Sequence, residues 1–331
     1  MGKSSKSLKN ALQSQQTRFK ARAKASHAAQ IAEQKARKMT GGRPISGGKA
    51  KMKTPLTKRP TVPFSPEDTI LLIGEGNFSF ARALARPSSS RTELAHLAHL
   101  PAKNITTTAY DSEEEVYAKY AEAKDIVASL REWGVEVLFG VDATKLEWTA
   151  ALKGRRWNKI VWNFPHAGNG IDDQDRNILS NQKLILGFLR STENFLKKGS
   201  IPNYNAKRRR RVSDDDEDEK QNGHEDEMDD IDASAESRTA SDRGTVLITL
   251  RNVPPYTLWD VPRLAKNPPL PTQGSAPPNP RYIVLRSFVF HREIWDGYEH
   301  RMTKGSRAHG TGKTGEGGED RTWEFCLKDN P

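Results

Sequence analysis

DTILLIGEGNFSFARALA, residues 68–85, is the stretch that decides how this chain folds. Its first part, 68–74, is a short apolar run bounded by an acid and a glycine, which is typical of a buried parallel strand. Gly74 and Gly76 then allow a tight turn, and the Ala- and Leu-rich residues that follow favour a helix. The stretch therefore predicts a strand, a glycine turn and a helix, as in the opening unit of an α/β sheet.

The same alternation continues along the chain. Six further β-rich or apolar runs are predicted as strands: 105–111, 135–144, 158–166, 244–251, 282–291 and 322–327. Helices are predicted between them: one from the N-cap Ser112 to Gly134, one from Asp172 or Asp173 to about Leu196, and a short one at 256–266. Alternating strands and helices predict an open, Rossmann-like α/β sheet with right-handed crossovers, closed by a β-hairpin.

Charge is distributed very unevenly. The 331 residues carry a net charge of +11, yet residues 1–60 alone hold sixteen Lys or Arg and a single acid, Glu33. Few large apolar residues accompany these charges, so 1–62 is predicted to be a disordered basic tail. A second disordered segment is predicted at about 202–243, where KRRRR is followed directly by an acidic run. The rest of 63–331 is long enough to form one sizeable domain.

Composition also excludes several classes of protein. Cys326 is the single cysteine, so the chain has no disulfide framework and no cysteine-based zinc cluster, and we expect no metal. No apolar run approaches the roughly 18 residues of a membrane span, and the first residues lack the apolar core of a secretory signal. The basic tail indicates binding to RNA and import into the nucleus or nucleolus, although a generic solvated tail has the same composition.

Three acidic or glycine-rich turns follow the first three predicted strands. Ligands of open α/β sheets bind beyond the carboxyl ends of the strands, where these turns lie. Gly76 would let a ligand approach the backbone, Asp111 could accept hydrogen bonds from ribose hydroxyls, and Asp142 could accept one from an adenine amino group. Each turn alone is weak evidence for a ligand site, since a glycine or an acid after a strand often belongs only to an ordinary turn or a helix cap. Together they predict a site for an adenosine that carries a small tail without phosphates.

A fourth turn, Asn163-Phe164-Pro165-His166, follows the fourth predicted strand. Asn163 offers a donor and an acceptor to a base edge, and Phe164 could stack on a planar base. Pro165 stiffens the turn, and His166 could accept a proton near neutral pH. The alternatives are core packing for Phe164 and a structural role for His166, with His291 and His300 as other candidate bases.

These residues carry a resemblance to a known family. ILLIGEGNFSFARALA, TTAYDSEEEVYAKY, FGVDATKL, VWNFPHAG and the later GYEHRMT together resemble the 25S rRNA (uridine-N3)-methyltransferase-like family over about 66–303. The resemblance implies a class I methyltransferase fold, a seven-stranded, mostly parallel sheet with an antiparallel last strand. It also implies S-adenosylmethionine as cofactor and large-subunit ribosomal RNA or a pre-ribosome as partner. The basic tail predicts the nucleus and nucleolus as the location, and we expect the protein to be a monomer.

The resemblance assigns roles to individual residues. Two groups of residues are implied to bind the cofactor. The methionine and ribose side would be lined by Gly74, Glu75, Gly76 and Asn77. The ribose and adenine would be contacted by Asp111, Asp142 and Ala143. The catalytic string is Asn163, Phe164, Pro165 and His166. Amino-group methyltransferases have Asn or Asp, Pro, Pro and an aromatic there, so only Asn163 and Pro165 carry over from that wider group.

Two other functions remain as alternatives. A non-catalytic ribosome-assembly factor could keep the same fold and bind RNA without transferring a methyl group. A nicotinamide-dependent oxidoreductase would need a third glycine where Ser79 stands and a shorter spacing to Asp111.

Overall fold

The computed structural model describes residues 60–168, 170–171, 173–204, 242–270, 278–301 and 319–329, together with Ser14 and Thr17. The predicted basic tail and charged insert lie almost wholly outside the described residues. Within these ranges, every helix is too short or too polar to cross a lipid bilayer.

Seven strands form one sheet in the order β3-β2-β1-β4-β5-β7-β6. Their bounds are β1 Ile70–Ile73, β2 Ile105–Thr108, β3 Glu136–Leu138, β4 Lys159–Asn163, β5 Thr245–Arg251, β6 Tyr282–Val289 and β7 Asp320–Leu327. The first five strands pair in parallel, and β7 runs antiparallel to both of its neighbours, β5 and β6. The predicted fold class, with a mostly parallel sheet and an antiparallel last strand, is confirmed.

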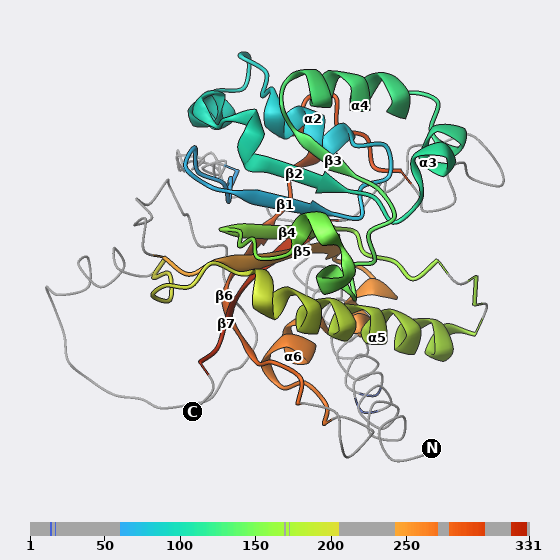
Figure 1. Cartoon of the computed structure of the whole chain (residues 1–331). Helices are drawn as coiled ribbons and strands as arrows, with labels where there is room; N and C mark the ends of the chain where they lie inside the picture. Colours follow the sequence, from blue (N-terminus) through green and yellow to red (C-terminus); the bar gives the residue numbers. More distant parts are fainter. Residues whose placement is uncertain are drawn as a thin grey trace, which may run out of the picture.

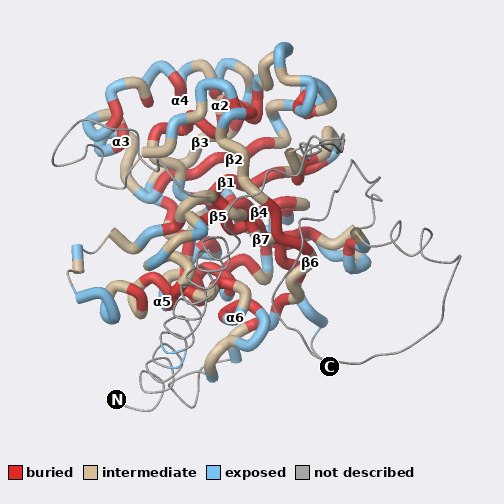
Figure 2. Tube along the Cα trace, turned by 180° about the vertical axis from the view of Figure 1, so that it is seen from behind, coloured by how far each residue is buried: buried red, intermediate tan, exposed pale blue. Residues whose placement is uncertain are grey.

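Helices cover both faces of the sheet (Figure 1). Their bounds are α2 Ser79–Ala85, α3 Glu113–Lys119, α4 Ala123–Glu132, α5 Gln174–Thr192 and α6 Val261–Lys266. Helices α2, α3 and α4 lie on one face, and α5 and α6 lie on the other. Because side chains alternate along a strand, β1 divides between two cores: Ile70 and Leu72 face the first group of helices, Leu71 and Ile73 the second. The buried residues therefore concentrate along the sheet and on the inner sides of the helices (Figure 2).

The strands are shorter than predicted at their carboxyl ends. The predictions at 105–111, 135–144 and 158–166 become strands that end at Thr108, Leu138 and Asn163. The residues beyond these points leave the sheet as loops, several of which enclose the site described below. Among these residues Tyr110 is 70% exposed and His166 is also exposed, so their composition alone does not place them in the sheet.

The single helix predicted from Ser112 to Gly134 is wrong: the chain forms α3 and α4, separated at Tyr120. Ser112 does form the predicted cap, in a capping box with Glu115. Tyr120 then adopts an extended backbone (φ −132°, ψ 101°) and is only 4% exposed. Its ring lies against Gly76, in the turn after β1. This long-range contact breaks the helix, and helical periodicity alone carries no information about it.

Candidate active site

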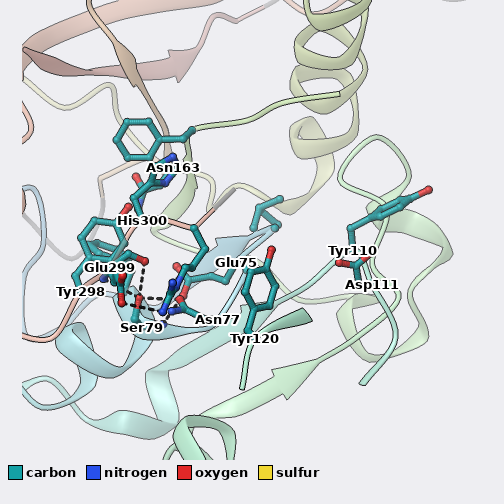
Figure 3. A pocket seen from close by; sticks show the side chains of 16 residues that line it. Glu75, Asn77, Ser79, Tyr110, Asp111, Tyr120, Asn163, Tyr298, Glu299 and His300 are labelled. Atoms are coloured by element: carbon teal, nitrogen blue, oxygen red, sulfur yellow. Dashed lines mark hydrogen bonds and ion pairs between the residues drawn. The ribbon is translucent and has the colours of Figure 1, made fainter. Parts of the chain in front are cut away.

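A cavity of about 100 Å³ opens beyond the carboxyl ends of β1, β2 and β4. Residues 298–301, the crossing segment, also line the cavity, although they are distant in the sequence from these three strands (Figure 3). Seven predicted site residues line it: Gly74, Glu75, Gly76, Asn77, Asp111, Asn163 and Phe164. Figure 3 shows His300 beside Asn163 and Glu299, and Asp111 beside Tyr110 at the other end of the cavity. The site predicted from separate turns is thus largely brought together by parallel strands that end at one edge of the sheet.

The glycine turn after β1 is shaped by close packing. Gly74 has φ +63°, and a Cβ there would lie 2.9 Å from Nε1 of Trp162. Its N–H donates to Oγ1 of Thr108 (3.2 Å), and the Glu75 N–H donates to the Thr108 carbonyl (2.8 Å). The turn is therefore tied to the end of β2 and leaves Gly76 at the cavity wall.

Glu75 is the most perturbed acid of the cavity. Burial raises the pKa of its carboxyl to about 7, although Oε2 accepts a hydrogen bond from the Ala81 N–H (3.1 Å) in the first turn of α2. This hydrogen bond favours the charged form, but it does not offset the loss of water around the carboxylate. Glu75 therefore changes charge near neutral pH.

Ser79, where a dinucleotide fingerprint would have glycine, connects the glycine turn to the crossing segment. Its Oγ donates to Oδ1 of Asn77 (2.8 Å) and accepts from the Glu299 N–H (3.0 Å). Asn77 in turn donates to Glu122 (2.8 Å), which also receives Arg301. These contacts hold residues 298–301 over the cavity. Of residues 298–301, sequence reasoning named His300 alone, as a candidate base, although the GYEHRMT stretch was a signal for the whole crossing segment.

The predicted acids lie in different surroundings. Asp111 lines the cavity and pairs with Lys119 of α3 at 2.7 Å. Asp142 does not line it: Oδ1 accepts from the N–H (2.8 Å) and the hydroxyl (2.7 Å) of Thr144, within its own loop. Ala143 is buried in the core on the α5 face of the sheet. Only Asp111 of the three therefore reaches this cavity.

The Asn163–His166 turn divides into two parts. Asn163 and Phe164 line the cavity, whereas Pro165 is buried and His166 is exposed outside its lining. Phe164 has the left-handed backbone of φ +54°, and its N–H donates to the Thr249 carbonyl (2.8 Å). Nδ1 of His166 accepts from the Gly168 N–H (2.9 Å). Neutral His166 therefore carries its proton on Nε2, and partial burial lowers its pKa.

Of the other candidate bases, only His300 lines the cavity. Its ring centroid lies 4.3 Å from that of Phe164. Burial, and then the positive charges of Arg292 and Arg251, lower the pKa of His300 to about 3. His300 is therefore neutral at physiological pH and can take part in hydrogen bonding and stacking there. His291 instead pairs with Glu293 (2.7 Å) beside a smaller neighbouring pocket.

Comparison with known proteins identifies the family. Residues 71–302 match the family described as rRNA (uridine-N3-)-methyltransferase BTM5-like. The chain belongs to this family. The match includes every predicted site residue, and it identifies the protein as an rRNA (uridine-N3-)-methyltransferase. The sheet order and the cavity at its carboxyl edge are consistent with this methyltransferase family.

Individual relatives are similar to this chain over different lengths. A Saccharomyces cerevisiae protein, 25S rRNA (uridine(2634)-N(3))-methyltransferase, is 28% identical over 268 residues, which are 75% of this chain and 70% of the yeast protein. An Arabidopsis thaliana protein, heavy metal-associated isoprenylated plant protein 41, is 34% identical over 40% of this chain and 24% of its own length. The mouse ferredoxin-fold anticodon-binding domain-containing protein 1 homolog is 32% identical over 39% of this chain and 18% of its own length.

Proposed function

We propose that this methyltransferase transfers the methyl group of S-adenosylmethionine to N3 of a uridine in large-subunit ribosomal RNA, in the nucleolus. The observation that carries the proposal is the shared cavity: the glycine turn and Asp111 open onto the same space as Asn163 and Phe164. A methyl donor and an acceptor base that bind there would lie next to each other, as transfer of the methyl group requires. The printed name of the yeast relative supports the large subunit as the source of the substrate.

The residues of the cavity fit S-adenosylmethionine, which supplies a methyl group on a sulfonium sulfur when bound. Asp111, at the end of β2, offers carboxylate oxygens to ribose hydroxyls, as such an acid does in related α/β sheets. Gly76 lines the cavity and has no side chain to keep a ligand from its backbone; a Cβ there would lie 3.2 Å from the Tyr120 ring. Asn77 and Glu75 add polar groups for the amino-acid part of the cofactor.

The opposite wall fits a planar base. Phe164 and His300 offer aromatic faces, and neutral His300 adds no positive charge. Uracil N3 carries a proton at neutral pH and lies on the Watson–Crick edge, so the target must be single-stranded or turned out of its helix. The basic tail would add sequence-independent affinity for phosphates, while the cavity selects the base. We infer that the protein acts on the RNA as a monomer.

Calorimetric titration with S-adenosylmethionine tests the cofactor site. We expect Asp111→Ala to weaken binding at least about tenfold, which corresponds to roughly 1.4 kcal/mol. Asp125→Ala, at an exposed position of α4, is the matched control and should bind like the wild type. Asp142→Ala tests whether its loop also borders the adenine. Equal binding by wild type and Asp111→Ala would contradict the assignment of Asp111, and saturable NADH binding instead would favour an oxidoreductase.

Incubation with S-adenosylmethionine and an unmodified large-subunit rRNA transcript tests the reaction. Mass spectrometry of the digested RNA should detect 3-methyluridine. RNA binding without any methylated nucleoside would instead favour a non-catalytic assembly factor.

A further inference from the structure

Asn163 is held by a row of threonines that crosses three strands. Asn163 of β4 is the register partner of Thr249 of β5, and Thr249 is the partner of Thr322 of β7. The Thr249 hydroxyl donates to Oδ1 of Asn163 at 2.8 Å, and the two threonine hydroxyls are 2.9 Å apart. Both threonines are at most 2% exposed. Water therefore does not compete for these hydrogen bonds.

This row determines which end of the Asn163 amide meets a ligand. A primary amide has one oxygen that accepts and one NH2 group that donates. Because the Asn163 oxygen is bonded to the Thr249 hydroxyl, the NH2 group is the end left to the cavity that Asn163 lines. The site thus presents a hydrogen-bond donor beside the Phe164 ring.

We propose that Thr249 is a positioning residue that orients the Asn163 amide and thereby makes the site selective for uracil. The inference rests on the proposed function, since it concerns the base in that same cavity. Uracil has a carbonyl oxygen, O4, beside N3, and the proposal places the Asn163 NH2 group at this oxygen as its hydrogen-bond donor. Cytosine has an amino group at C4, whose hydrogens would face the NH2 group at the equivalent position.

The same donor favours the reacting form of the base. When N3 loses its proton to water, the negative charge spreads onto the two neighbouring carbonyl oxygens. A preorganised N–H donor at one of them stabilises this charge, as donors do in an oxyanion hole. Arg292, whose guanidinium carbon lies 4.7 Å from the centre of the Phe164 ring, is paired with Asp320 and is therefore not the main stabiliser of this charge.

Thr249→Val tests the proposal, because valine keeps the shape of threonine and removes the hydroxyl. We expect kcat for 3-methyluridine formation to fall about a hundredfold, the loss typical of one oxyanion donor, with little change in S-adenosylmethionine affinity. The pH–rate profile should move to higher pH, and the preference for uridine over cytidine at the mapped position should fall. Thr249→Ser keeps the hydroxyl and should restore most of the rate.

Thr107→Val is the matched control for loss of a buried hydroxyl. Thr107 lies in β2, is fully buried, and its Oγ1 has no hydrogen-bond partner, so this variant should keep the wild-type rate and selectivity. Full activity and selectivity of Thr249→Val would overturn the inference. Asn163→Asp supplies an independent test that leaves Thr249 in place: loss of uridine methylation supports an NH2 group at the base, and retention would overturn it. If the wild type forms no 3-methyluridine, the proposed function fails as well; if it does, the failure belongs to the inference alone.

Discussion

At the scale of single residues, Glu75 shows how burial in the site changes the pKa of an acidic side chain. Its carboxyl accepts a hydrogen bond from the Ala81 N–H in the first turn of α2, and the half-buried side chain also lines the cavity. Burial raises its pKa from 4.5 to about 7. Between these values the folded protein keeps a proton that the unfolded chain releases. Stability contributed by this proton is present at low pH and falls as the pH rises through this window.

Glu75→Gln should remove that fall, because a neutral amide has no charge to bury. Compared with the wild type, the variant should gain up to about 3 kcal/mol in unfolding free energy between pH 5 and pH 8. Urea unfolding at both pH values measures the difference. Glu114→Gln, at an exposed position of α3, controls for loss of a surface charge. An unchanged pH dependence in Glu75→Gln would show that Glu75 does not titrate in this range.

Gly74 makes a second prediction at this scale. Gly74→Ala combines a left-handed backbone with a clash against Trp162, so we expect a loss of about 2–3 kcal/mol. Gly140→Ala is a matched control, since Gly140 has a similar φ of +66° but no atom within 4 Å of its Cβ position. It should cost only about 1 kcal/mol from backbone strain. Equal losses in thermal unfolding would mean that packing against Trp162 contributes nothing.

At the scale of elements, capping residues in the sequence predict where α3 and α5 begin, whereas the break between α3 and α4 depends on tertiary contacts. Ser112 and Asp173 accept hydrogen bonds from the N–H groups of Glu115 and Arg176, as their sequence patterns predict. The break at Tyr120 has no such local signal. It brings Tyr120 and Glu122 to the cavity, where they contact Gly76 and Asn77.

Ser112→Ala tests the cap of α3. Loss of the side-chain acceptor should cost about 1 kcal/mol in unfolding free energy. Ser129→Ala in α4 is the control, because Ser129 is mid-helix and its hydroxyl bonds only the Asp125 carbonyl one turn earlier. That variant should be close to neutral, since alanine is the better helix former. A larger loss for Ser129→Ala than for Ser112→Ala would contradict the role of the cap.

At the scale of the whole molecule, a buried ionic cluster joins the strands of one side of the sheet. Glu324 of β7 is fully buried and receives Lys159 of β4 and Arg286 of β6. The Thr245 hydroxyl of β5 donates to the same carboxylate (2.7 Å). Side chains from four neighbouring strands thus contact the Glu324 carboxylate, which links these strands to one another.

Glu324→Gln should destabilise the whole fold, because two buried cations would lose their shared carboxylate. We expect a loss of about 3–5 kcal/mol in unfolding free energy. Asp296→Asn breaks an exposed pair with Arg91 and should have little effect. Chemical unfolding followed by circular dichroism compares the two, and similar losses would argue that the buried cluster is not a special contributor.

The basic tail belongs to the same scale. In the full chain, replacing the sixteen Lys and Arg of residues 1–60 by Gln should weaken RNA binding and reduce its dependence on salt concentration. Cofactor binding should be unchanged, since the cavity residues are untouched. An unaltered salt dependence would show that the tail does not contact phosphates.

Sequence patterns alone predicted the layers, the strands and seven of the residues that line the cavity. Hydrophobic runs, glycine turns and caps are local, and parallel strands necessarily bring the residues after β1, β2 and β4 to one edge. Which side chains face the cavity depends on the packing of the folded chain. It separated Asn163 from His166 within one turn, left Asp142 in its own loop, and placed Ser79, Tyr120, Thr249 and His300 at or beside the site. These choices depend on contacts between residues as much as 220 positions apart, such as Ser79 with Glu299, and short-range sequence patterns cannot encode them.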